Sequence, residues 1–226
     1  EEQTVWLWDE AESAYIQRNL TEDLEVAPGQ GFFVLTNAAG NFSITEAMQS
    51  HQTSDTFKSS DNRPEINLVI TNGAEVRDAD IYYIDETTTG FDNGYDSSIF
   101  GGVTNEFAVY TQAVANGTGK DLGIQSLPNN DFENMVIPVG INATSGTEII
   151  ISATSANLPT GIHVYLEDKD DNSFTLLDDS STLQTTFTNT SNGVGRFFIH
   201  TKTQPLSNAD QAELNNVSIY LSDDNF

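Results

Sequence analysis

The amino-acid sequence predicts an all-β protein, an antiparallel β-sandwich with jelly-roll-like connections. Three observations support this prediction. The apolar runs are short and rich in β-branched and aromatic residues, turn-forming residues separate them, and helical periodicity is sparse. Many short strands with turn signals between them are typical of sandwiches and barrels, whereas βα units alternate strands with longer helical patterns.

The expected strands follow one another along almost the whole chain. In one of them Ile66, Leu68 and Ile70 share one face, because successive side chains of a strand point to opposite sides. The expected strands, in chain order, are 5–8, 32–35, 66–70, 81–84, 107–110, 122–124, 135–139, 149–151, 162–166, 174–177, 195–200 and 217–221.

Turn chemistry lies between these runs. Asn72-Gly73 and Asn192-Gly193 supply the positive-φ positions that hairpins need. Helical signal is confined to two segments. Residues 45–49 suit a single turn with Thr45 as its cap, and residues 207–214 suit a short helix or a linker.

The length of 226 residues suits one large sandwich or two small domains. Hydrophobic residues make up 37% of the chain and aromatic residues 10%, which is enough for a packed core. We expect the β-sandwich module to cover residues 1–214. For residues 1–60 two alternatives stay open: they add strands to the same sandwich, or they form a separate N-terminal sub-unit. We expect residues 215–226 to be a linker and the start of a further, truncated domain.

The charge balance excludes several partners. The chain has 8 Lys and Arg against 34 Asp and Glu, a formal net charge of −26. A field of this sign repels phosphates and anionic lipid head groups, so we expect no nucleic-acid binding. No apolar run reaches about 18 residues, so we also expect no direct membrane insertion. The acidic residues fit either solubility in a salty medium or binding of a divalent cation such as Ca²⁺.

The sequence carries no recognisable catalytic motif, which predicts a non-catalytic protein. There is no cysteine, and thus neither a disulfide nor a thiolate metal site. The stretch 117–120, Gly-Thr-Gly-Lys, lacks the upstream glycine and the following Ser or Thr of a phosphate loop. Neither a G-x-S-x-G nor an H-E-x-x-H motif occurs. Because a glycosidase needs only two carboxylates, a glycan-active enzyme stays as the least favoured alternative.

Two acidic loops are candidate calcium sites. Asp168, Asp170 and Asn172 have the spacing of the opening of a D-x-D-x-N calcium loop, although Ser173 replaces the usual glycine. The favoured alternative for this loop is a solvated hairpin tip.

Asp92 and Asp96 flank Gly94 and form the second candidate, since a tight turn can bring the two carboxylates to one cation. An Asx-turn loop held by its own backbone hydrogen bonds is the equal alternative.

Aromatic residues are candidates for glycan binding. Trp6 and Trp8 are two positions apart, so they share one face of a strand, and two rings on one face can stack on a sugar. Tyr82 and Tyr83 point to opposite faces, which makes Tyr82 a third candidate. Core packing is the ordinary alternative for the two tryptophans.

Several motifs resemble segments of a known family. The stretch 27–34, Ala-Pro-Gly-Gln-Gly-Phe-Phe-Val, is followed by Phe-Ser-Ile-Thr-Glu-Ala-Met at 42–48. Further matching pieces lie, in the expected order, at 91–96, 122–128, 137–140, 164–168 and 195–197. The ordered set resembles the β-sandwich region that precedes the C-terminal sorting domain in type IX secretion system cargo proteins of Bacteroidota. Residues 216–220 are similar to the first strand of that sorting domain.

The resemblance implies export across the outer membrane and a secreted or cell-surface location. It also implies that the type IX secretion machinery is a partner, through the missing C-terminal domain. These regions accompany enzymes, adhesins and glycan-handling proteins alike, so the resemblance assigns no functional residue.

These observations lead to one main functional expectation and one alternative. The main expectation is a non-catalytic module of a multidomain surface protein that binds polysaccharide or mediates adhesion. The alternative is a purely structural spacer that connects an upstream domain to the secretion sorting domain.

Overall fold

The computed structural model describes residues 2–206, except 23, 37, 42, 50–61, 118, 179 and 205. The described part is built from strands and one short 3-10 helix, η1 (Glu46–Met48). The strands are β1 (Val5–Asp9), β2 (Ala14–Arg18), β3 (Phe32–Val34), β4 (Glu65–Thr71), β5 (Val76–Ile84), β6 (Ser97–Ser98), β7 (Ala108–Thr111), β8 (Leu122–Pro128), β9 (Val136–Asn142), β10 (Glu148–Ala156), β11 (His163–Asp168), β12 (Ser173–Leu177), β13 (Leu183–Thr186) and β14 (Phe197–Lys202).

The large sheet folds over on itself into two layers around one hydrophobic core. Its strand order is β12-β11-β14-β9-β7-β8-β5-β4-β10-β13, with β6 beside β8. Buried side chains of β4, β5 and β10 belong to the same cluster as those of β9, β11 and β14, although these strands lie far apart along the sheet. β7 and β8 share a single register pair, so the sheet bends between them. The prediction of an all-β sandwich is confirmed.

The alternating pattern of the sequence determines which face of each strand enters this core. In β4, Ile66, Leu68 and Ile70 are all fully buried, as predicted. The opposite face of β4 and β5 carries polar side chains such as Asn67 and Asp78. This outer face is the surface against which the N-terminal part of the chain lies.

One pair of strands departs from the predicted antiparallel arrangement. β5 and β8 are parallel, with Asp80 opposite Ile124, while the other paired strands of the described residues are antiparallel. Parallel neighbours require a long crossover connection. Residues 85–121 supply it, and they carry β6 and β7 on the way.

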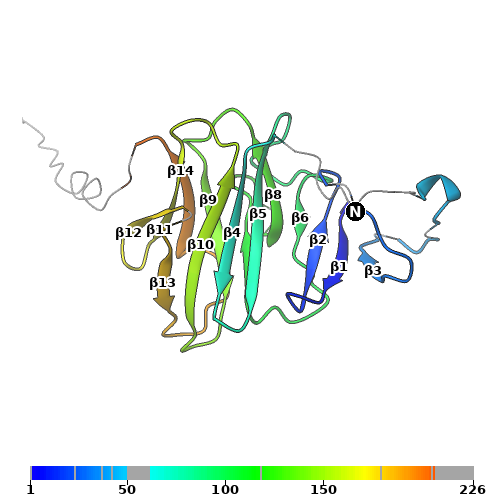
Figure 1. Cartoon of the computed structure of the whole chain (residues 1–226), viewed down its shortest axis with the longest axis horizontal. Helices are drawn as coiled ribbons and strands as arrows, with labels where there is room; N and C mark the ends of the chain where they lie inside the picture. Colours follow the sequence, from blue (N-terminus) through cyan, green and yellow to red (C-terminus); the bar gives the residue numbers. More distant parts are fainter. Residues whose placement is uncertain are drawn as a thin grey trace, which may run out of the picture.

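Residues 5–34 form a separate three-stranded sheet in the order β2-β1-β3, which lies to one side of the sandwich in Figure 1. Hydrogen bonds hold it there: Thr4 Oγ1 donates to Ser97 Oγ (3.0 Å), and Trp6 Nε1 donates to the Ser98 carbonyl (2.9 Å). Whether residues 1–60 fold as a sub-unit of their own stays a prediction. The predictions for 207–214 and 215–226 lie outside the described residues.

An ion pair between Lys120 and a buried carboxylate, that of Glu2, strengthens this attachment. Glu2 is 5% exposed, and its Oε2 lies 2.5 Å from Lys120 Nζ. The Ser98 backbone N–H also donates to Glu2 Oε1 (2.6 Å). Although burial of Glu2 acts in the opposite direction, the hydrogen bonds from Lys120 and Ser98 lower the pKa of this carboxyl below its usual range.

Candidate functional site

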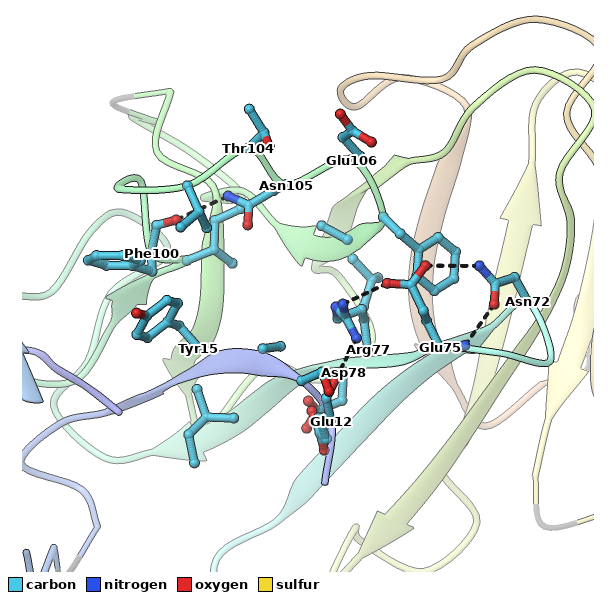
Figure 2. A pocket seen from close by; sticks show the side chains of 18 of the residues that line it. Glu12, Tyr15, Asn72, Glu75, Arg77, Asp78, Phe100, Thr104, Asn105 and Glu106 are labelled. Atoms are coloured by element: carbon cyan, nitrogen blue, oxygen red, sulfur yellow. Dashed lines mark hydrogen bonds and ion pairs between the residues drawn. The ribbon is translucent and has the colours of Figure 1, made fainter. Parts of the chain in front are cut away.

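A groove of about 500 Å³ opens where the N-terminal sheet meets the sandwich. We call it the seam groove (Figure 2). The N-terminal sheet contributes Trp8, Glu12 and Tyr15 to its lining, and the sandwich contributes β5 and the loop at 99–106. A volume of several hundred Å³ is typical of small-ligand sites.

Aromatic side chains form one end of the seam groove. Trp8 of β1 pairs with Tyr15 of β2, and directly opposed residues of neighbouring strands share a face. Their ring centroids are 5.2 Å apart, and the Tyr15 ring lies 4.5 Å from that of Phe100. Figure 2 shows Tyr15 and Phe100 side by side. Trp8 is 47% exposed and its Nε1 donates to Glu10 Oε2 (2.9 Å), so the indole is both held and open to solvent.

Trp6 has a different environment, although it lies on the same face of β1 as Trp8. It is 5% exposed, its ring centroid lies 5.9 Å from that of Phe100, and its indole N–H donates to the Ser98 carbonyl. Trp6 therefore anchors the N-terminal sheet to the sandwich. The two-tryptophan platform predicted from the sequence does not form, because the sandwich covers the inner of the two rings.

Charged side chains lie at the other end of the seam groove. Arg77 donates from Nη1 to the Glu12 carbonyl (3.0 Å) and from Nη2 to Glu75 Oε1 (2.9 Å). Asp78 Oδ2 accepts a hydrogen bond from Asn67 Nδ2 (3.0 Å). Figure 2 shows the side chains of Glu12, Glu75, Arg77 and Asp78 gathered there.

The pKa values of two carboxyls of the groove are raised. Burial raises the pKa of Glu12, and the negative charges of Asp78 and Asp9 raise it further. Burial also raises the pKa of Asp78, together with the negative charge of Asp80. The described lining of the groove holds four carboxylates, those of Glu12, Glu75, Asp78 and Glu106, against the single guanidinium of Arg77.

Polar groups of two loops complete the lining. Asn105 Nδ2 donates to the Phe100 carbonyl (3.1 Å), which fixes the loop that also carries Thr104 and Glu106. Asn72 Oδ1 accepts from the N–H groups of Ala74 (3.0 Å) and Glu75 (2.8 Å). Gly73 follows with φ of 87°, which fits the turn expected at 72–73.

Tyr82, the third aromatic candidate, lies away from this groove. It is 5% exposed, the Arg63 guanidinium lies 3.5 Å from its ring centroid, and its hydroxyl donates to Glu22 Oε1 (3.3 Å). With one ring face under an arginine and little surface exposed, its placement does not suit stacking on a sugar. The N-terminal segment covers the outer face of β5 at this point.

The loop at 92–96 is organised by protein donors. Asp96 is fully buried, and its two carboxylate oxygens accept from the backbone N–H groups of Ser126 and Asp92 (both 2.6 Å). Asp92 in turn accepts from the Thr88 N–H (2.5 Å) and from its hydroxyl (3.1 Å). Donors from the loop, from Thr88 and from Ser126 of β8 thus engage both carboxylates, and a cation at this loop stays a prediction.

The acidic side chains of the loop at 168–172 are paired with the guanidinium of Arg196, which comes from outside the loop. Asp168 is 1% exposed and accepts from Arg196 Nε (2.9 Å) and Nη2 (2.7 Å). Asp170 lies 3.3 Å from the same guanidinium, and Asn172 has φ of 49° at the tip of the β11–β12 hairpin. Asp170 and Asn172 are exposed, as the solvated hairpin tip would have them, whereas Asp168 is buried and paired with Arg196. Among the residues that the structure describes, no group of three or more His, Cys, Asp or Glu side chains is placed to hold a metal.

The residues that line the seam groove beside Trp8 were not among those expected from the sequence. Tyr15 lies in the run Ala-Tyr-Ile-Gln-Arg, whose alternation is a strand signal, and the turn at 10–13 directly precedes it. A hairpin of 5–9 with 14–18 would have placed Tyr15 opposite Trp8. No local signal indicates Phe100 or Arg77, because they reach the groove through long-range packing.

Comparison with known proteins bears on the family of the chain. No curated protein and no solved structure matches it. No helix in the described ranges is long and apolar enough to cross a membrane. One family model, described as a domain of unknown function (DUF8693), matches residues 6–200, a stretch that includes both the N-terminal sheet and the sandwich. The chain therefore belongs to the DUF8693 family of domains of unknown function.

Proposed function

We propose that this chain is a non-catalytic module that binds polysaccharide in the seam groove. One observation carries the proposal: the indole of Trp8 is 47% exposed at the edge of a groove that also presents Thr104, Asn105 and Glu12. The apolar face of an aromatic ring suits the C–H groups of a sugar, while polar side chains suit its hydroxyls.

The module fits a secreted or cell-surface multidomain protein, where glycan binding would serve adhesion. Its acidic surface supports this setting, because a net charge of −26 favours solubility in a salty medium. Connection to a secretion machinery through a C-terminal sorting domain belongs to the same proposal and rests on the sequence motifs.

Affinity electrophoresis tests the proposal. The protein is run through native gels that contain soluble polysaccharides from plant and algal sources, and retardation by at least one of them is expected. Trp8→Ala should weaken binding about tenfold, which corresponds to about 1.4 kcal/mol. Tyr95→Ala is the matched control, because Tyr95 is an aromatic residue, 40% exposed, that does not line the seam groove.

The competing candidate is a structural spacer. The ion pair between Glu2 and Lys120 and the hydrogen bond from Trp6 to Ser98 favour it, because they fasten the N-terminal sheet rigidly to the sandwich. If no polysaccharide retards the protein, the glycan proposal falls and the spacer is supported. Equal retardation of the wild type and Trp8→Ala would show binding at another surface.

A further inference from the structure

We infer that the seam groove selects neutral polysaccharides over anionic ones. This inference rests on the proposed function and concerns the ligand class of the same site. It starts from the charges of the groove. The described lining residues include four carboxylates, Glu12, Glu75, Asp78 and Glu106, and one cationic side chain, Arg77.

Arg77 is already engaged by neighbouring groups of the protein. Its Nη1 donates to two backbone carbonyls, those of Glu12 (3.0 Å) and Val76 (2.7 Å), and its Nη2 donates to Glu75 Oε1 (2.9 Å). Recognition of a carboxylate or a sulfate by arginine uses the paired N–H groups of the guanidinium fork. Here the protein holds the Nη1 and Nη2 end of this fork, and the Glu75 carboxylate, 2.9 Å away, offsets its positive charge.

The acids that remain suit hydroxyl groups instead. Glu106 is exposed and Glu12 is half-buried, and both line the groove. Ionised carboxylates accept hydrogen bonds and donate none, so they pair with the hydroxyls of a sugar. A uronate or sulfate group in the same place would face these carboxylates with a charge of the same sign.

The aromatic end does not discriminate by charge. Trp8 and Tyr15 would stack on the apolar face of any pyranose, whether or not the sugar carries an acidic substituent. Selectivity between a neutral chain and its charged counterpart must then come from the acidic end of the groove. Like charges about 6 Å apart repel enough to weaken binding about tenfold at low ionic strength, and added salt screens this repulsion.

The test compares each neutral polysaccharide with its own sulfated derivative, so that the backbone stays constant. Affinity electrophoresis first identifies a neutral glucan, mannan, xylan or galactan that retards the wild-type protein. Dissociation constants are then measured for that polysaccharide and its sulfated form at about 20 mM and 500 mM salt. We expect the sulfated form to bind at least tenfold more weakly at low salt, with a smaller difference at high salt.

Two charge variants separate the groove from the overall charge of the protein. Glu12→Gln with Glu106→Gln removes two charges from the groove and should narrow the gap between the neutral and sulfated forms. Glu148→Gln with Asp171→Asn removes two exposed charges outside the groove and should leave the gap as in the wild type.

The outcomes distinguish this inference from the function on which it rests. If the neutral and sulfated forms bind equally, or the sulfated form binds more tightly, the inference is overturned and glycan binding stands. If both double variants narrow the gap equally, the selectivity comes from overall charge and the inference is again overturned. If no polysaccharide binds at all, the proposed function fails and the inference fails with it.

Discussion

Trp6 and Trp8 lie on the same face of the same strand, yet one is buried and the other is 47% exposed. The alternation of strand side chains predicts the shared face from sequence alone. It does not predict exposure, because that depends on where Phe100 and Ser98 lie, about ninety residues further along the chain. The exposed aromatic surface at the seam groove therefore includes one tryptophan, Trp8, beside Tyr15.

Asp96 provides a test at the scale of one residue. Its side chain is fully buried, and this burial raises its pKa from an ordinary 3.8 to about 7. Between these two values the folded state binds more protons than the unfolded state, so the unfolding free energy should fall as the pH rises from about 4 to 7. A difference of about three pKa units corresponds to roughly 4 kcal/mol.

Urea denaturation of the wild type and Asp96→Asn between pH 4 and pH 8 measures this contribution. The variant cannot ionise at this position, so its stability should depend less steeply on pH. Burial also raises the pKa values of Glu22 and Asp78. These two residues are present in both proteins, so they contribute equally to the pH dependence of stability in each. Asp131→Asn, at an exposed position, is the control and should retain the wild-type slope. Identical slopes for wild type and Asp96→Asn would contradict the prediction.

At the scale of the elements, the sequence predicts the core strands well and the peripheral ones poorly. The alternation of β4 places its core residues correctly, because burial on one face imposes that pattern. β2 and β13 were not expected, since their runs, Ala-Tyr-Ile-Gln-Arg and Leu-Gln-Thr-Thr, are short and polar. The parallel pairing of β5 with β8 was also missed, because it joins strands that are distant along the chain.

The contact between β2 and β8 offers a test of how the N-terminal sheet is attached. A methyl carbon built on Gly123 would lie 2.4 Å from Gln17 Cδ, and Gln17 is 8% exposed. Gly123→Ala should therefore destabilise the protein by about 1 kcal/mol, because the buried amide must move. Chemical denaturation measures the loss.

Two further variants show whether this contact is the cause. Gly123→Ala combined with Gln17→Ala should recover part of the stability that the single Gly123 substitution removes, since the opposing side chain is gone. Gly31→Ala is the control, because nothing lies within 4 Å of a methyl group at that position. An additive loss in the double variant would contradict the predicted clash.

The two acidic loops lead to a prediction about calcium. In both loops the carboxylates already accept hydrogen bonds from protein donors, with Arg196 paired to Asp168 and backbone N–H groups paired to Asp96. At a constant ionic strength of about 0.15 M, the thermal midpoint should thus be the same with a chelator and with millimolar Ca²⁺. A bound ion at a hundredfold excess over its dissociation constant would add about 2.7 kcal/mol of stability. A clear rise of the midpoint with Ca²⁺ would therefore contradict the hydrogen-bonded arrangement.

At the scale of the whole molecule, the dominant property is charge. The 34 acidic residues stand against 8 basic ones, and a compact fold brings like charges closer together than an unfolded chain does. Among the acidic residues that the structure describes, Glu2, Asp96 and Asp168 are buried and bonded to donors, whereas the others are exposed or half-buried. Self-repulsion of the solvated acids opposes the compact state, while the buried acids hold loops and the N-terminal sheet in place.

Screening of this repulsion should stabilise the fold. The Debye length falls from about 30 Å at 0.01 M salt to about 10 Å at 0.1 M, so repulsion between surface carboxylates weakens strongly over this range. We expect the thermal midpoint to rise by roughly 3–6 °C, the shift that about 1–2 kcal/mol produces in a domain of this size. Differential scanning calorimetry in NaCl and in tetramethylammonium chloride measures it. Both salts should act alike if screening is the cause, whereas a rise with one cation alone would instead indicate a specific ion site. A midpoint that stays constant or falls with both salts would contradict a destabilising self-repulsion.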